Sequence, residues 1–153
     1  MTEEWLIDGY NLLYDLQHRK SGKSVVSRES LFHALANFSS ASGRTVLVVL
    51  DGKGDDSDWA PFKTSKLEIL YSKAVSADTH IEKILCERKG LCQFYVVTRD
   101  RAITNMARGF GAQVLTTELF ITMLTESESE NKETMLRHRI KGLGFNRPFG
   151  DKL

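Results

Sequence analysis

The sequence lacks long hydrophobic runs, has few cysteines and carries no excess of charge of one sign. No stretch approaches the roughly 18 uncharged apolar residues that a membrane-spanning helix needs. The first residues, Met1–Glu4, are acidic where a signal peptide is basic, so we expect a cytoplasmic protein with no membrane partner. The two cysteines, Cys86 and Cys92, are too few for a disulfide scaffold and lack the spacing of a zinc site, which favours reduced thiols.

Charge is balanced overall but unevenly distributed. The chain has 153 residues, of which 21 are basic and 20 acidic, and its net charge of +1 argues against a strongly basic coat for nucleic acid. Residues 126–131 are acidic and poor in apolar side chains, whereas residues 132–153 are mainly basic. We therefore expect one folded domain over residues 1–125, followed by an acidic linker and a basic tail over residues 126–153.

Short apolar runs alternate with segments of helical spacing, which predicts an α/β fold. The predicted strands are Trp5–Ile7, Thr45–Leu50, Leu67–Ser72, Gln93–Thr98 and Ala112–Leu115. The predicted helices are Ser27–Ala41, Ala77–Lys89, Arg101–Arg108 and a last one that begins at Thr116 or Thr117 and runs through Leu124. The first two strands are almost continuously apolar, which is typical of central parallel strands, whereas the third alternates and is expected at an edge.

Acidic residues follow three of these strands. Asp8 and Asp51 come directly after the first and second strands, and Asp100 lies two residues past the fourth. Ligands of an open parallel sheet bind at the carboxyl ends of its strands, so these acids belong at one edge. Asp78 and Glu82 lie four residues apart near the start of the next helix and share one face. Up to five carboxylates are therefore expected together.

Crowded carboxylates either have raised pKa values or bind a cation. An all-oxygen ligand set without histidine or cysteine favours Mg²⁺ or Mn²⁺, whose chemistry at such a site is metal-assisted hydrolysis of a phosphodiester. Asn11 could orient a carboxylate, a water or a phosphate, or could simply cap a helix or turn. Each acid could also have a purely structural role, as the cap of a helix or as part of a turn, and this applies above all to Asp78. Glu82 could pair with Lys83 on the surface.

The segment Asp8–Leu13 resembles the start of the YacP-like NYN domains, a group of PIN-like nucleases. Segments 48–52, 71–72, 76–82 and 96–100 continue the resemblance in the same order, and it spans nearly residues 1–124. The resemblance implies a three-layer PIN-like fold in which helices cover both faces of a parallel sheet of about five strands in the order 3-2-1-4-5. It further implies a metal-dependent endoribonuclease that acts on single-stranded RNA, above all mRNA, with the ribosome as a further partner.

The same resemblance implies roles for individual residues. Asp8, Asp78 and Asp100 would be the ligands of Mg²⁺ or Mn²⁺, and Asp51, Glu82 and Asn11 would support them. The chain departs from the family pattern at three cations, Lys53, Arg99 and Arg101. These could hold RNA phosphates, but Arg99 and Arg101 could also neutralise Asp100 and weaken it as a ligand.

Other basic residues could hold the substrate. Arg19, Lys20 and Lys23 follow the first motif, and the tail contains Arg137, Arg139 and Lys141 with Phe145 and Phe149 interleaved. Positive charge combined with aromatic stacking is how proteins hold single-stranded RNA without strict sequence choice. Alternatively, the tail is a solvated end and its phenylalanines dock onto the domain itself.

Two other functions compete with the endoribonuclease. The first is a catalytically weak or inactive RNA-binding or ribosome-associated module on the same fold. The second is an aspartyl-phosphate enzyme or a signalling receiver. The Asp8-Gly9-Tyr10 sequence lacks the Asp-x-Asp that the phosphatase needs, and no lysine follows the fifth strand as a receiver requires. The second alternative therefore ranks last.

Overall fold

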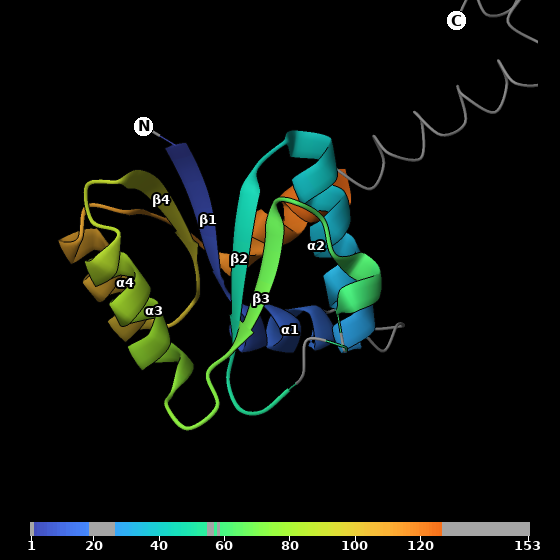
Figure 1. Ribbon diagram of the computed structural model, residues 1–153, viewed down its shortest axis with the longest axis horizontal. Helices are drawn as coiled ribbons and strands as arrows, with labels where there is room; N and C mark the ends of the chain where they lie inside the picture. The colour runs from blue at the N-terminus through green and yellow to red at the C-terminus, as the bar shows by residue number, and fades with distance from the viewer. Residues whose placement is uncertain (1, 19–26, 55–56, 58, 127–153) are drawn as a thin grey trace, which may run out of the picture.

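The computed structural model describes residues 2–18, 27–54, 57 and 59–126. These residues form a five-stranded parallel sheet in the order β3-β2-β1-β4-β5, with helices on both sides (Figure 1). The strands are β1 (Thr2–Asp8), β2 (Thr45–Leu50), β3 (Leu67–Tyr71), β4 (Cys92–Val97) and β5 (Gln113–Leu115). The helices are α1 (Gly9–Gln17), α2 (Arg28–Ser42), the 3₁₀ helix η2 (Ala60–Phe62), α3 (Ala77–Glu87), α4 (Arg101–Gly109) and a last helix over residues 117–126.

Strand β1 lies at the centre of the sheet, where Ile7 is in register with Val48 of β2 and Val97 of β4. This confirms the predicted strand order, the central position of the first two strands and the edge position of the third. Because all five strands are parallel, their carboxyl ends lie at the same edge of the sheet. The α/β class and the prediction of the five strands are therefore confirmed.

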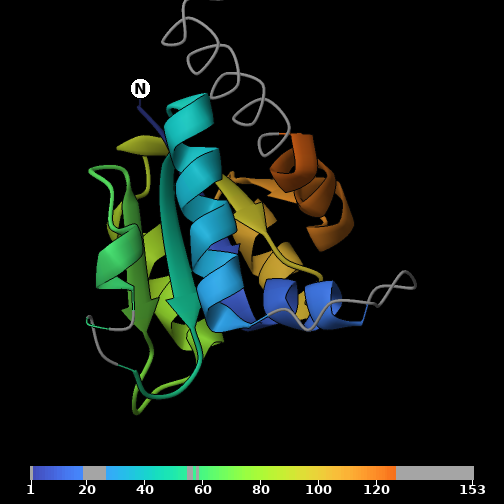
Figure 2. The same cartoon turned by 90° about the vertical axis from the view of Figure 1, so that its right-hand side faces the viewer.

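Hydrophobic side chains pack on both faces of the sheet, which gives the predicted three layers. Successive side chains of a strand point to opposite faces. Trp5 accordingly packs with α1, α2 and the helix over residues 117–126, whereas Leu6 packs with α3 and α4. Figures 1 and 2 show the same division, with α3 and α4 on one side of the strands and α2 on the other.

Capping residues set the ends of the predicted helices. The hydroxyl of Ser27 accepts a hydrogen bond from the backbone N–H of Ser30 at 3.2 Å, and α2 ends before Gly43, which has a left-handed φ of 69°. The oxygen Oγ1 of Thr116 accepts from the N–H of Leu119 at 3.2 Å at the start of the last helix. These ends match the sequence predictions, because serine, threonine and glycine supply the geometry that helix ends need.

Helix α1 was not predicted. It is short and follows β1 directly, and although aspartate is a common capping residue, Asp8 at its N-cap position makes no side-chain capping bond. Leu12 and Leu13 bury its inner face against the core. Asn11 lies inside this helix, so it does not cap the start of α1.

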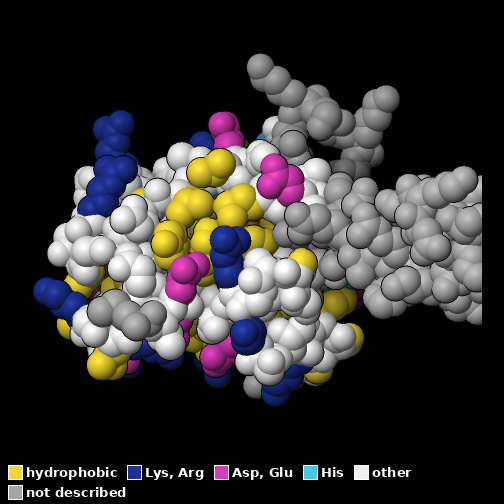
Figure 3. Space-filling view, turned by 90° about the horizontal axis from the view of Figure 1, so that it is seen from above, with side chains coloured by type: hydrophobic (Ala, Val, Ile, Leu, Met, Phe, Trp, Pro, Cys, Tyr) yellow, Lys and Arg dark blue, Asp and Glu magenta, His cyan; other side chains and the backbone are white. Residues whose placement is uncertain are grey.

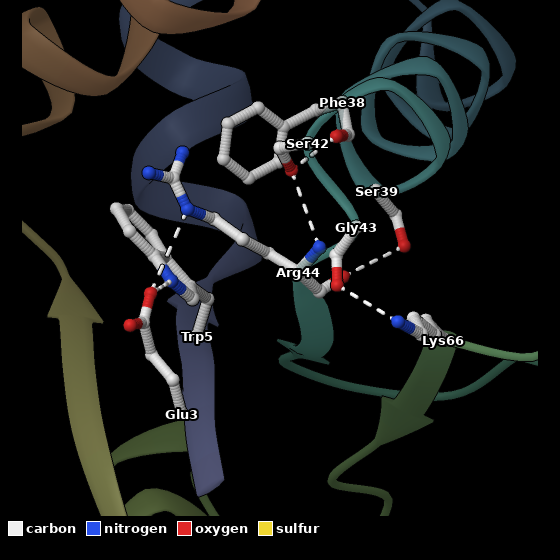
Figure 4. Close-up of polar contacts among 8 residues, drawn as sticks. All are labelled: Glu3, Trp5, Phe38, Ser39, Ser42, Gly43, Arg44 and Lys66. Carbon is white, nitrogen blue, oxygen red and sulfur yellow. Dashed lines mark hydrogen bonds and ion pairs between the residues drawn. The ribbon is translucent and has the colours of Figure 1, made fainter.

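The amino ends of the strands carry a mixed cluster away from the predicted acids (Figure 4). The guanidinium of Arg44 lies over the rings of Trp5 and Phe38, 4.8 and 5.6 Å from their centroids, and pairs with Glu3 at 3.6 Å. Figure 3, which looks onto this end, shows hydrophobic side chains gathered among charges of both signs. The acidic cluster therefore has to be sought at the opposite end of the sheet.

Two further predictions concern the described part of the chain. None of its helices has the length and apolar character that crossing a membrane requires. Cys86 is exposed, Cys92 is partly buried, and the structure has both as free cysteines.

Candidate active site at the carboxyl edge of the sheet

Four of the predicted acids lie where the chain leaves the carboxyl edge of the sheet. Asp8 is the last residue of β1, Asp51 follows β2, and Asp100 stands at the N-cap of α4 just beyond β4. Asp78 lies in the first turn of α3, which starts at the same edge. The α3 cap is Ser76, whose hydroxyl accepts from the N–H of Thr79 at 3.2 Å, so Asp78 is not needed as a cap.

Asp8 is the most buried of these acids, with 4% of its surface exposed. Its Oδ2 accepts a hydrogen bond from the hydroxyl of Thr98 at 3.1 Å. Burial raises the pKa of Asp8 from 3.8 to about 6, and the charges of Asp78 and Asp100 act in the same direction. The hydroxyl of Thr98 and the nearby backbone N–H of Asn11 oppose this rise because they stabilise the ionised form.

Electrostatic coupling connects all four aspartates. The pKa of Asp78 is raised by partial desolvation and then by the charges of Asp100 and Asp51. Asp51 thus joins the group that Asp8, Asp78 and Asp100 form. Glu82 is exposed on α3 one turn after Asp78, and it is not among the groups that shift the pKa of Asp8 or Asp78. The structure brings together four of the five predicted carboxylates, and the role of Glu82 stays a prediction.

Two buried hydroxyl groups hold the strand ends together. Thr98, the residue after β4, donates to Asp8 and accepts from the backbone N–H of Asp100 at 3.0 Å. Ser72, the residue after β3, donates to Oδ1 of Asp51 at 3.1 Å and accepts from the N–H of Gly52 at 3.0 Å. Each hydroxyl therefore fixes one carboxylate and one backbone turn at the same time.

Asn11 and Asp15 tie helix α1 to the segment between β4 and α4. Oδ1 of Asn11 accepts from the backbone N–H of Arg99 at 3.0 Å. The guanidinium of Arg99 forms an ion pair with Asp15, which raises the pKa of Arg99, and Asp15 also accepts the hydroxyl of Thr117. The ion pair of Arg99 is thus made with Asp15 rather than with Asp100.

The close packing of α1 against β2 accounts for the glycine at position 9. A Cβ atom at this position would lie 2.5 Å from Cδ2 of Leu50 and 3.0 Å from the carbonyl oxygen of Val49. The 2.5 Å contact is closer than real Cβ atoms come to a neighbour, and the backbone oxygen of Val49 cannot turn aside as a side chain can, so a side chain here would strain the packing of α1 on β2. The glycine allows α1 to start immediately beside the buried carboxylate of Asp8.

The chemistry of the acidic cluster fits a hard divalent cation. All four side chains offer carboxylate oxygen, and a cation would relieve the burial and repulsion that raise the pKa values of Asp8 and Asp78. Within the described ranges, no three acidic, histidine or cysteine side chains stand close enough together to be a ready ligand group. The donors therefore suit Mg²⁺ or Mn²⁺ in type and charge, and binding requires that the side chains come closer together.

Several predicted RNA-binding residues can be located. Lys53, Arg99 and Arg101 are exposed near the carboxyl edge, after β2 and β4. The other predicted cations, Arg19, Lys20, Lys23, Arg137, Arg139 and Lys141, lie outside the described residues, as do Phe145 and Phe149.

Sequence reasoning assigned no role to Thr98, Ser72 or Asp15. Thr98 and Ser72 were noted in their motifs, and their position directly after a strand was the signal available. Buried hydroxyls at strand ends also occur without any site nearby, so this signal is weak. Asp15 gave no signal because α1 itself was not predicted.

Comparison with known proteins supports the interpretation of these motifs. The family model of the YacP-like NYN domain matches residues 5–147 and so extends past residue 125, the predicted end of the folded domain. The domain boundary stays a prediction. The crystal structure of Rae1 (YacP) from Bacillus subtilis matches with a TM-score of 0.74 and 19% identity, over 97% of this chain and 88% of that chain. A mutant of the same protein matches with a TM-score of 0.64 and 21% identity, over 99% and 89% of the two chains. Among curated proteins, no sequence matches significantly. The chain belongs to the YacP-like NYN domain family, a family of PIN-like nucleases.

Proposed function

We propose that the protein is a metal-dependent endoribonuclease that hydrolyses phosphodiester bonds of single-stranded RNA, with mRNA as its main substrate. The observation that carries this proposal is the gathering of Asp8, Asp51, Asp78 and Asp100 at one sheet edge, where the pKa of buried Asp8 is raised to about 6. Burial raises this pKa most and the neighbouring acids add to it, and a carboxylate held at such a cost is typical of functional sites, where a bound cation offsets the cost.

Asp8, Asp78 and Asp100 would hold Mg²⁺ or Mn²⁺. When bound, such a cation supplies activation of water and neutralises charge that develops on the phosphodiester. Asp8 faces inward and is oriented by Thr98, whereas Asp100 uses Oδ1 to accept from the N–H of Ile103 at 3.1 Å, which fixes its rotamer. The supporting residues are Asp51, Glu82 and Asn11.

The RNA would be held by cations around this edge. Lys53 and Arg101 are exposed beside the strand ends, and Arg99 is held in place by Asp15. Guanidinium and ammonium groups bind phosphates regardless of base sequence. The predicted basic residues outside the described part of the chain would add to this contact, and the ribosome is the further partner that the family resemblance implies.

An RNA-binding module without catalysis is the second candidate. It is favoured by the finding that, among the described residues, no three potential ligands form a ready metal site. On this alternative the acids would only shape the edge of the sheet, and RNA would bind without being cut.

Cleavage of a labelled, unstructured RNA by the full-length protein tests the two functions. With Mn²⁺ or Mg²⁺ we expect internal cleavage that EDTA stops, and a loss of about 100-fold or more in Asp8→Asn and in Asp78→Asn. Glu87→Gln is the control, because it removes one exposed carboxylate at the end of α3 away from the site.

The outcomes separate the candidates clearly. Cleavage that is unchanged in both aspartate variants would remove the proposed site. RNA binding without cleavage by the wild-type protein at any divalent cation concentration would favour the module instead.

A further inference from the structure

Helix α1 carries a row of exposed aromatic side chains that starts beside the acidic cluster. Tyr10 and Tyr14 are 38% and 53% exposed, and their spacing of four residues places them on one face of the helix. The ring of His18, four residues further on, stacks on Tyr14 with 4.0 Å between centroids. The helix runs across the end of the sheet at which Asp8 lies (Figure 2), so the row begins two residues from that carboxylate.

An arginine lies against each tyrosine. The guanidinium of Arg28 packs over Tyr10 and Tyr71, 5.9 and 5.2 Å from the ring centroids. Its Nε and Nη2 atoms are buried and have no hydrogen-bond partner among the described residues. Arg28 is only partly exposed, so it brings positive charge to the side of Tyr10, where that charge attracts phosphate groups near the surface.

The second arginine faces outward. The Cζ atom of Arg99 lies 5.6 Å from the ring centroid of Tyr14. In its ion pair with Asp15, the side chain of Arg99 is 56% exposed and that of Asp15 only 13%. The surface therefore presents the cation, while the carboxylate that anchors it faces the interior and Thr117.

We propose that these five residues, Tyr10, Tyr14, His18, Arg28 and Arg99, form a track that binds single-stranded RNA and leads it to Asp8. This inference rests on the proposed function and specifies which surface holds the substrate. Every base has a π-face, so bases stack on exposed rings whatever the sequence, while the charge of Arg28 attracts the phosphates and the exposed guanidinium of Arg99 contacts them. Bases inside a duplex have no free face to offer, so the track selects unpaired RNA.

Binding is measured with a fluorescein-labelled, unstructured 12-nucleotide RNA in EDTA, where no cleavage occurs, by fluorescence anisotropy. Tyr14→Leu should weaken binding by about 5- to 150-fold, the range of one base stacked on one ring, and Tyr10→Leu should act in the same direction. Tyr14→Phe keeps the ring and should bind about as well as wild type. A duplex RNA of the same length should bind Tyr14→Leu and wild type equally.

The role of Arg99 is tested through the salt dependence of RNA binding. Arg99→Gln should lower the slope of log K against log salt by about one. Arg108→Gln removes the same charge from the exposed last turn of α4 and should leave the slope unchanged. Thermal unfolding of each variant shows whether it is still folded, so that a loss of structure is not mistaken for a loss of RNA binding.

The results distinguish the track from the nuclease proposal. If both leucine variants bind the single strand like wild type, the track is wrong, even where the wild-type protein cleaves RNA with Mn²⁺. If the leucine variants lose binding while the wild-type protein cleaves nothing, the track stands and the nuclease proposal fails.

Discussion

Replacement of Asp8 by asparagine should stabilise the metal-free protein at neutral pH. Asp8 has a pKa of about 6 in the folded protein against an ordinary value of 3.8, because its carboxylate is buried beside other acids. At about 1.36 kcal/mol per pKa unit, ionised Asp8 lowers the free energy of unfolding by about 3 kcal/mol. Asparagine has nearly the same shape, can still accept the hydrogen bond from Thr98 and carries no charge, so it removes this cost.

The sign of the effect depends on pH. Between about pH 4 and pH 6 the folded protein binds a proton at Asp8 more tightly than the unfolded chain, so the wild-type protein loses stability as pH rises through this window. The difference between Asp8→Asn and wild type should therefore be near zero below pH 4 and complete above about pH 7. For a chain of this length, about 3 kcal/mol corresponds to about 6–12 °C in the midpoint of thermal unfolding.

Thermal unfolding followed by circular dichroism in EDTA, from pH 4 to pH 8, measures this difference. Added Mn²⁺ should raise the midpoint of the wild-type protein and leave that of Asp8→Asn nearly unchanged, because the variant lacks a proposed ligand. Glu87→Gln, an exposed control, should stay within about 0.5 kcal/mol of wild type throughout. A variant that is less stable than wild type at pH 7, or a difference that does not change with pH, would refute the electrostatic account of Asp8.

Two further substitutions test how the site is supported. Thr98→Val keeps the shape of the side chain but removes the donor to Asp8 and the acceptor for the backbone N–H of Asp100. In urea unfolding it should lower the free energy of unfolding by about 1–3 kcal/mol, and it should raise the pKa of Asp8 further. Unchanged stability would show that these two hydrogen bonds contribute little. Gly9→Ala should lower the free energy of unfolding by about 1–3 kcal/mol, because its Cβ would press on the carbonyl oxygen of Val49. Gly109→Ala, with no atom within 4 Å of its Cβ, should be neutral or stabilising. Equal effects of the two substitutions would contradict the packing argument.

The strand and helix pattern was predictable because it depends on neighbours in the sequence. The apolar run of β2 and the residues at the ends of α2, Ser27 and Gly43, act locally, and the structure has a strand and a helix where the sequence predicts them. Helix α1 gave only a weak local signal, since it is short and follows β1 without a break, and Asp8 does not cap it with its side chain. Its formation depends on the burial of Leu12 and Leu13 against the sheet, which is a tertiary effect.

The sequence by itself determined that acids follow parallel strands, and therefore that Asp8, Asp51 and Asp100 share one edge with Asp78. Only the tertiary structure decided how buried each acid is and which groups surround it. The pKa of Asp8 depends on its burial, on the hydroxyl of Thr98 ninety residues away and on charges from two other elements. Such contacts are set by packing between distant segments, and no spacing along the chain encodes them.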